Sequence, residues 1–289
     1  IWDCTDFDDL DWFIKIHVQR RKSAGRMRLS QKTYIQGMVD RYLTRRGRTF
    51  TKIDTPMDPK TRLSTSMSPV SESDKLEMRR NIPFRQLLGS LQYARLTRPD
   101  AIQAISSVAK FSTNPGMPHY EAGIRVLRYL YTTQNHCLDY KSSGLAPGQP
   151  WNIEVYVDAD WANDPDFRRS RSGFIIMANN NPISFGSGLQ PKTSSSTPVA
   201  EYVALASAVK ELIWLKQLLR ELNVGVIEPV TVHEDNTTCI HIAKNPASPK
   251  RTRHIDIRYH FLRDYVVAKE ITVEYCKSKD MLADILTKA

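Results

Sequence analysis

Cysteine is scarce in this sequence, and the few cysteines present form no recognisable site. Four occur, far apart and without a CxxC pair: Cys4, Cys137, Cys239 and Cys276. Structural zinc sites use closely spaced pairs, and disulfide frameworks belong to small secreted chains. We therefore expect neither, and an intracellular, reducing environment fits this cysteine usage best.

Long apolar stretches are also missing. No run of about 18 apolar residues occurs, so no transmembrane span is expected. The first six residues, Ile-Trp-Asp-Cys-Thr-Asp, are acidic where a signal peptide is basic, so no secretory leader is expected. The sequence does not begin with Met, which predicts an internal piece of a longer polypeptide. Apolar residues still make up 41% of the 289, enough for hydrophobic cores in two domains of ordinary size.

The net charge of +10 comes from one half of the chain. Residues 1–146 contain 24 Lys and Arg against 14 Asp and Glu, whereas residues 147–289 contain 17 of each. A basic half of this kind commonly follows a phosphate backbone, although it can also be an ordinary solvated surface. Of the two, we favour nucleic acid as the partner.

A change in composition separates these halves. Residues 141–150, KSSGLAPGQP, are rich in Ser, Gly and Pro, which disfavour helices and central strands. We interpret this stretch as a linker between a first domain, residues 1–146, and a second domain, residues 147–289. A further loop is expected at residues 55–74.

The first half is expected to be mainly helical after one initial strand. Alternating apolar residues in WFIKIHVQRR predict a half-buried strand, and apolar residues at helical spacing predict the helices that follow. The strand covers residues 12–21, and the helices cover residues 30–43, 84–96, 101–111 and 121–133.

The second half is expected to be an α/β domain. Three strands come first, the last two joined as a hairpin through ANNNP, and helices then alternate with strands. This order predicts one mixed five-stranded sheet flanked by helices. The predicted strands are 151–160, 172–179, 181–188, 229–236 and 271–276, and the predicted helices are 199–222, 237–245, 258–270 and 279–288.

Four acidic residues hold informative positions in that order. Asp158 and Asp235 come at the ends of two predicted strands, where ligands of open α/β sheets gather. Glu201 continues the apolar stripe of the long helix back by one turn, so it faces the sheet. Asp284 is the single acid in the body of the last predicted helix.

Any one of these acids alone is more often a cap, a turn or a surface residue. Together they are more specific, because carboxylates about 4 Å apart repel by roughly 4 kcal/mol per pair at an effective dielectric of 20. Divalent cations relieve that repulsion, and two ions about 3.5–4 Å apart are a common device for phosphodiester cleavage. All-oxygen ligands favour Mg²⁺ or Mn²⁺ over zinc.

The residues also carry a resemblance to a known family. The second half resembles the RNase H domain of copia-type LTR retrotransposon Pol polyproteins, and the first half is similar to the thumb and connection region that ends their reverse transcriptase. The motifs that carry this are YVDADWANDPDFRRSRSGFIIM, STPVAEYVALASAVKELIWLKQLL, EDNTTCIHIAKNP, TRHIDIRYHFLRD and DMLADILTK in the second half, with DLDWFIKIHV, TPMDP, FRQLLGSLQYARLTRPD and HYEAGIRVLRYL in the first.

This resemblance implies a ribonuclease that cleaves the RNA strand of an RNA–DNA hybrid with two Mg²⁺ or Mn²⁺ ions. The family's acidic ligands correspond to Asp158, Glu201, Asp235 and Asp284, with Asp158 bridging both ions, Asp235 on the nucleophile side and the other two opposite. Asp160 is a neighbour that is not usually a ligand. The implied partners are the hybrid and the upstream fingers and palm of the polymerase, in the cytoplasm inside a virus-like particle or in the nucleus.

Several departures keep an alternative open. The polymerase motif YxDD is absent, so DNA synthesis by this chain alone is not expected. The loop CKSKDM lacks the His that many RNase H enzymes carry there, Phe185 stands where the family often has Trp, and His254 is expected to be structural. The alternative is a domesticated or inactive fragment that binds nucleic acid or a protein partner without cleaving; an integrase-type nuclease fits poorly, because such enzymes use three acids at other spacings.

The acids and arginines that follow Asp160 have a separate expectation. Asp164 and Asp166 are expected to shape the turn into the hairpin, and Arg168, Arg169 and Arg171 to meet phosphate or solvent.

Overall fold

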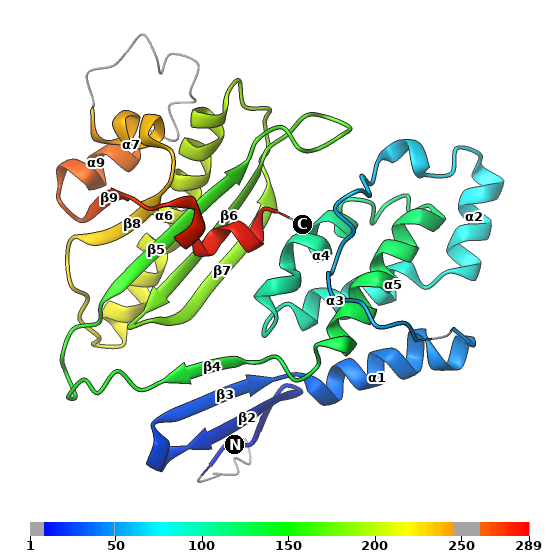
Figure 1. The fold of residues 1–289 in the computed structure, drawn as a ribbon, viewed down its shortest axis with the longest axis horizontal. Coiled ribbons are helices and arrows are strands. Elements are labelled where there is room, and N and C mark those ends of the chain that lie inside the picture. The colour runs from blue at the N-terminus through cyan, green and yellow to red at the C-terminus, as the bar shows by residue number, and fades with distance from the viewer. Residues whose placement is uncertain (1–8, 49, 246–260, 289) are drawn as a thin grey trace, which may run out of the picture.

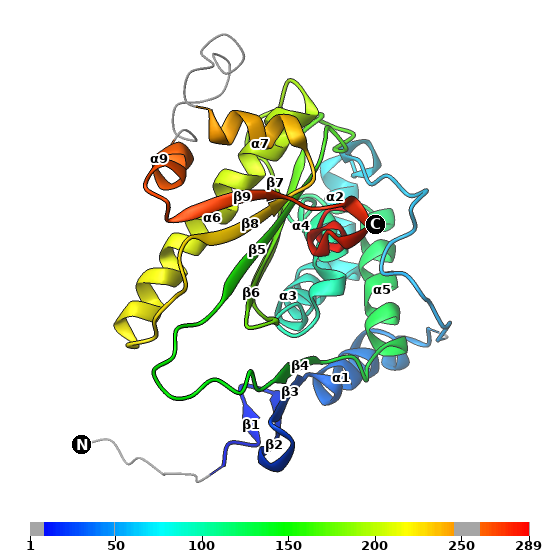
Figure 2. The same cartoon turned by 60° about the vertical axis from the view of Figure 1, so that its left-hand side comes forward.

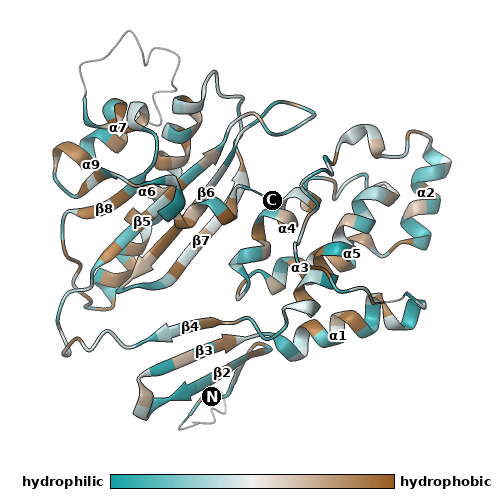
Figure 3. Ribbon diagram, viewed as in Figure 1, coloured by the Kyte–Doolittle hydropathy of each residue, from teal (hydrophilic) through white to brown (hydrophobic). Residues whose placement is uncertain are grey.

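The computed structural model describes residues 9–48, 50–245 and 261–288 (Figure 1). Buried apolar side chains form two main cores, one in each half of the chain. The first lies among the helices that follow β3, and the second lies between the five-stranded sheet and α6 (Figure 1). Figure 3 shows how hydropathy differs between elements. Hydrophobic residues recur along the central strands β5 and β8, whereas hydrophilic residues dominate α2, which buries no side chain.

The first half opens with an antiparallel sheet in the order β1-β2-β3-β4. The prediction of one strand over residues 12–21 is wrong, because Ile14 and Lys15 adopt left-handed φ angles of 47° and 61° and turn the chain into a hairpin. Two partner strands were also not predicted. The strands are β1 (Trp12–Phe13), β2 (Ile16–Arg21), β3 (Arg26–Ser30) and β4 (Leu138–Lys141).

Helices form the remainder of the first half. The four predicted helices are confirmed, with apolar faces that meet in one core. An additional helix, α2, begins at the cap Ser71, whose hydroxyl accepts a hydrogen bond from the Asp74 amide. The helices are α1 (Lys32–Tyr42), α2 (Glu72–Asn81), α3 (Phe84–Ala94), α4 (Ile102–Ala109) and α5 (Met117–Thr132).

The second half contains the mixed five-stranded sheet that the sequence predicts. Its order is β7-β6-β5-β8-β9, with β5, β6 and β7 antiparallel and β8 and β9 parallel to β5. Asn179 and Asn180, both with positive φ, form the predicted turn between β6 and β7. The strands are β5 (Ile153–Asp160), β6 (Arg171–Ala178), β7 (Asn181–Leu189), β8 (Val230–Glu234) and β9 (Ile271–Tyr275).

One face of this sheet is covered by α6 (Thr197–Glu221), which packs across β5 and β6. The helices α7 (Thr237–Lys244) and α9 (Phe261–Val267) follow. The predicted helix over residues 258–270 is confirmed only for α9, and residues 258–260 lie outside the described residues, as does His254.

The prediction of a final α-helix over residues 279–288 is wrong. Two short 3₁₀ turns, Ser278–Asp280 and Leu282–Leu286, stand there instead, with extended Met281 between them. Figure 2 shows this C-terminal segment on the opposite side of the sheet from α6. It lies close to β6 because Gly173 has no side chain: a Cβ there would come within 2.7 Å of Thr287 Cγ2 and 2.9 Å of Leu286 Cβ.

The two halves pack against each other through this same face. Ile102 at the start of α4, Ile175 on β6 and Leu286 in the C-terminal segment form a small apolar cluster, with Phe185 packed against it. The connecting residues 141–150 are mostly exposed and irregular after β4 ends at Lys141. The C-terminal segment is therefore held between the sheet and the first half.

Candidate metal centre

A gap between two neighbouring strands creates the site. The parallel strands β5 and β8 pair only as far as Tyr156 and His233. Asp158 and Asp235 each lie two residues beyond that last pair, so they border the opening. The prediction that Asp158 ends its strand is wrong, because β5 stays paired with β6 through Asp160.

Three of the four predicted acids converge at this gap. Asp158, Glu201 and Asp235 each place a carboxylate oxygen within 4.8 Å of the other two. Glu201 comes from α6, where it is buried with 3% of its surface exposed, as its position on the apolar stripe predicted. Strand tips and one helix face thus bring together acids that are far apart in the sequence.

The fourth predicted acid, Asp284, is connected to this group through a lysine. Lys288 Nζ lies 2.8 Å from Asp284 Oδ1 and 3.7 Å from Asp158 Oδ1. Thr287, next to that lysine, donates its hydroxyl hydrogen to Asp158 Oδ2. The C-terminal segment therefore places Asp284 beside the group without making it part of the tight cluster.

Burial and mutual repulsion raise the proton affinity of these acids. Burial is the main cause that raises the pKa of Asp158, and the charges of Asp284 and Asp235 add to it against the opposing effects of Thr287 and Lys288. Burial again comes first for Glu201, whose pKa is raised well above its ordinary value, followed by the negative charges around it. A raised pKa favours the protonated form of an acid, and a nearby cation favours its charged form.

A fifth acid, Glu234, belongs to the site and was missed from the sequence. It is fully buried, and burial and the nearby Asp235 and Asp158 raise its pKa. A signal was available: Val230, Val232 and Glu234 alternate on β8, and all three are buried. A strand register that places two valines in the core places this glutamate there as well.

Two buried oxygens at the site lack partners. Glu201 Oε2 and Glu234 Oε2 accept no hydrogen bond within the part of the chain that the structure describes. A buried carboxylate oxygen without a partner is costly, and a bound cation relieves that cost. Because the donor set is entirely carboxylate oxygen, the residues fit a hard divalent ion such as Mg²⁺ or Mn²⁺.

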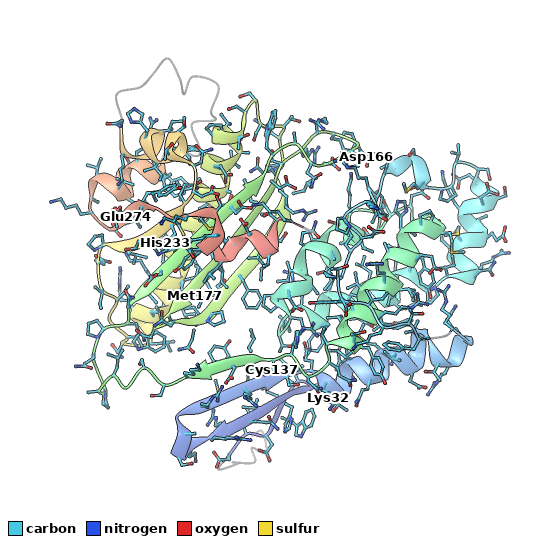
Figure 4. All side chains as sticks on the ribbon, viewed as in Figure 1. Lys32, Cys137, Asp166, Met177, His233 and Glu274 are labelled. Carbon is cyan, nitrogen blue, oxygen red and sulfur yellow. The ribbon has the colours of Figure 1, made fainter. Side chains whose placement is uncertain are left out.

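Asp164 and Asp166, which were predicted only to shape a turn, also bind residues of the first half. Asp166 accepts hydrogen bonds from Ser64 Oγ at 2.7 Å and Lys110 Nζ at 2.5 Å, both in the first half, and Lys110 also pairs with Asp164. Figure 4 shows Asp166 at the boundary between the halves. Asp164 also accepts from the Phe167 amide, so it shapes the loop and pairs across the junction.

The three arginines of this loop separate in the structure. Phosphate or solvent was expected around all three, but Arg171 is shielded from solvent: it is only 7% exposed and donates to the hydroxyls of Ser106 and Ser107 at 2.9 and 3.0 Å. Arg169 lies over the Phe167 ring, 5.2 Å from its centre. Arg168 is exposed, with a left-handed φ of 53°.

Comparison with known proteins gives the chain its family. It is 34% identical over 288 residues to the retrovirus-related Pol polyprotein from transposon TNT 1-94 of Nicotiana tabacum, covering 99% of this chain and 21% of that protein. It is also 34% identical over 285 residues to the Pol polyprotein from transposon RE1 of Arabidopsis thaliana, covering 98% of this chain and 18% of that protein. The chain belongs to the copia-type retrotransposon Pol polyproteins.

The match to these copia-type Pol proteins spans about a fifth of their length. A shorter relative is the secreted RxLR effector protein 161 of Plasmopara viticola, 36% identical over 137 residues that cover 47% of this chain and 93% of that protein. No family model matches the sequence.

Solved structures similar to the copia-type chain include RNase H1 from Halobacterium salinarum and the N-terminal RNase H domain of Rv2228c from Mycobacterium tuberculosis. The first has a TM-score of 0.34 and 14% identity, covering 46% of this chain and 92% of that one. The second has a TM-score of 0.33 and 12% identity, covering 47% and 89%. Both scores are low, so the RNase H-like fold is assigned from the strand order described above.

Membrane crossing finds no support in the described ranges. None of the helices there combines the length and the apolar character that a membrane span requires.

Proposed function

We propose that this chain is a metal-dependent endoribonuclease, the RNase H part of a retrotransposon reverse transcriptase, which cleaves the RNA strand of RNA–DNA hybrids. The observation that carries the proposal is the convergence of Asp158, Glu201 and Asp235 within 4.8 Å, two of them buried. Unpartnered carboxylate oxygens at the same place support a cation-dependent site. Family membership supports the hybrid as substrate.

The proposed ligands are Asp158, Glu201, Asp235 and Asp284, for two Mg²⁺ or Mn²⁺ ions. Such ions, when bound, supply an activated water and stabilise the leaving 3′ oxygen. The chain orients its own carboxylates through hydrogen bonds from the segment after β9. Ser278 donates to Asp235 Oδ2 at 2.7 Å, and Thr287 donates to Asp158.

We further propose that residues 1–146 act as the thumb and connection region and residues 147–289 as the RNase H domain. The excess of positive charge in residues 1–146 supports a role in holding a phosphate backbone. The fingers and palm of a longer Pol protein would be the partner for polymerisation, within the cytoplasm or the nucleus. The direct contacts between the halves support a hybrid that touches both.

The test is cleavage of an end-labelled RNA–DNA hybrid in Mg²⁺ by the whole chain. Asp235→Asn should abolish cleavage, because it removes one of the three convergent charges. Asp280→Asn is the matched control: it removes an exposed acid on the neighbouring turn and should leave cleavage intact. Absence of cleavage by the unmodified chain in both Mg²⁺ and Mn²⁺ would refute the enzyme.

The alternative function is a domesticated fragment that binds nucleic acid or a protein without cutting. The relative of Plasmopara viticola favours keeping it, because 93% of that separate protein matches part of this chain. The same assay decides: hybrid binding without cleavage by the unmodified chain supports the alternative.

A further inference from the structure

A cavity of about 300 Å³ lies between the two halves, next to the carboxylate cluster but outside it. Its walls come from the loop of residues 57–63, from α4, from the loop between β5 and β6, and from the C-terminal segment. The junction pocket, as we name it, is defined by Arg62, Lys110, Asp160, Arg169, Arg171 and Lys288.

Basic residues outnumber acidic residues on the walls of the junction pocket, five to three. Lys110 is paired with Asp164 and Asp166, and Lys288 is paired with Asp284 and Asp158. Arg62 is exposed, and its charge acts on Asp160: burial raises the pKa of that acid, and Arg62 is among the groups that lower it. Asp58 and Asp160 also line the walls, so three arginines face two carboxylates there.

Arg171 makes this imbalance more consequential because it is buried. All its hydrogen bonds among the described residues go to serine hydroxyls, those of Ser106, Ser107 and Ser187, and none goes to a carboxylate. Burial lowers the pKa of its guanidinium, and the nearby charges of Asp160 and Asp164 only partly oppose this. A buried cation without a directly bonded anion is stabilised when an anionic ligand enters beside it.

The position of the pocket indicates which anion. Asp160 lines it and lies on the same face of β5 as Asp158, two residues away, which is about 7 Å along a strand. One nucleotide unit spans such a distance. A strand with one phosphodiester at the carboxylates therefore brings a neighbouring phosphodiester to the arginines.

We propose that the junction pocket binds a backbone phosphate of the substrate strand, next to the linkage that is cut, through Arg62 and Arg169 with Arg171 behind them. The inference rests on the proposed function, since it places a nucleic-acid strand at the carboxylates. Because Arg62 comes from the first half and Arg169 from the second, the two halves share this subsite. Guanidinium groups suit the task, since they bind phosphate oxygens in pairs.

The experiment measures hybrid binding by fluorescence anisotropy in EDTA, across a range of salt concentrations. The test variant is Arg62→Met/Arg169→Met, in the whole chain. The control is Arg79→Met/Arg80→Met, which removes the same charge from exposed positions of α2, at the far edge of the molecule from the five-stranded sheet (Figure 1). Thermal unfolding of each variant checks that it is folded.

We expect the test variant to bind at least tenfold more weakly at low salt. Its slope of log K against log salt should be shallower by about 1 to 2, since each lost phosphate contact removes about 0.9. The control should change affinity less than twofold. Equal behaviour of the two variants would overturn the subsite. Full competition by inorganic phosphate at micromolar concentration would also overturn it, because it would indicate a site for a free anion.

Cleavage in Mg²⁺ is measured in parallel to separate the two proposals. Binding that depends on the arginines, without cleavage, refutes the nuclease and leaves the subsite standing. Cleavage with equal binding by both variants refutes the subsite alone. Failure of the unmodified chain to bind hybrid refutes both.

Discussion

The ammonium group of Lys288 lies 2.8 Å from Asp284 Oδ1 and 3.7 Å from Asp158 Oδ1. A side-chain cation therefore already contacts two of the carboxylates proposed as metal ligands. A divalent ion and this ammonium cannot both hold the same oxygens. Lys288 is half exposed, so it can swing away when an ion binds.

Replacing Lys288 with Met should tighten Mn²⁺ binding. A half-exposed ion pair contributes on the order of 0.5–1 kcal/mol, so its loss should increase affinity roughly two- to fivefold. Titration calorimetry with Mn²⁺ measures this. Lys279→Met, which removes an exposed charge from the neighbouring turn, controls for the general effect of net charge. If both variants gain equally, Lys288 does not compete with the ion.

Gly173→Ala should disturb the site although this residue carries no functional group. The new Cβ would collide with Thr287 and Leu286, which hold the C-terminal segment on the sheet. Overpacking of this kind costs about 1–3 kcal/mol and should displace Asp284, so both the Tm and the Mn²⁺ affinity should fall. Gly188→Ala on β7 has no atom within 4 Å of its new Cβ and is the matched control. An unchanged Mn²⁺ affinity in Gly173→Ala would contradict this account.

Without divalent ions, the stability of the protein should fall as the pH rises. Burial raises the pKa values of Glu201, Glu234 and Asp158, so these acids bind protons more tightly in the folded chain. Their stabilising contribution is complete below the unfolded pKa of about 4 and is lost as the pH rises through the raised values. Glu234→Gln should therefore raise the Tm in EDTA at pH 8 more than at pH 5.

Two further measurements check this dependence. Exposed Glu77→Gln should show no such difference between the two pH values. Mg²⁺ should raise the Tm of the unmodified chain more at pH 8 than at pH 5, because the ion requires deprotonated ligands. A Tm in EDTA that rises steadily from pH 5 to pH 8 would count against a buried, uncompensated cluster.

Asp166→Ala should loosen the junction between the halves. Burial alone would raise the pKa of Asp166, but hydrogen bonds from Lys110, Ser64 and Thr65 outweigh it and lower that pKa. Hydrogen bonds to a charged group contribute about 1.5–3 kcal/mol, so the unfolding free energy should fall by roughly that amount. Urea unfolding measures it, with Asp280→Ala as an exposed control. A loss no larger than in the control would show that the junction does not depend on this residue.

The sequence was sufficient where one pattern determined one element. The alternation in β5 to β9 and the stripe of α6 predicted the second sheet and the inward position of Glu201, because burial on one face leaves a clear period. Prediction from the sequence failed where a local backbone conformation or a distant partner strand determined the structure. Ile14 and Lys15 turn in left-handed conformations that apolar alternation does not reveal, and β3 pairs with β4 more than a hundred residues away.

Other failures have equally local reasons. The C-terminal residues carry helical apolar spacing, but extended Met281 breaks the helix so that the segment can lie against Gly173. Glu234 was not predicted as part of the site, although its register on β8 places it in the core with Val230 and Val232. The junction pocket could not be predicted, because it forms only where residues from both halves meet.

The apolar cluster of Ile102, Ile175 and Leu286 has a practical consequence for fragments of this chain. A fragment that starts at residue 147 would keep every proposed ligand but lose Ile102. The sheet face around Ile175 and Phe185 would then be exposed to solvent. We expect such a piece to self-associate through that face and to hold Asp284 poorly. Preparations meant for metal titration or crystallisation should therefore retain α4.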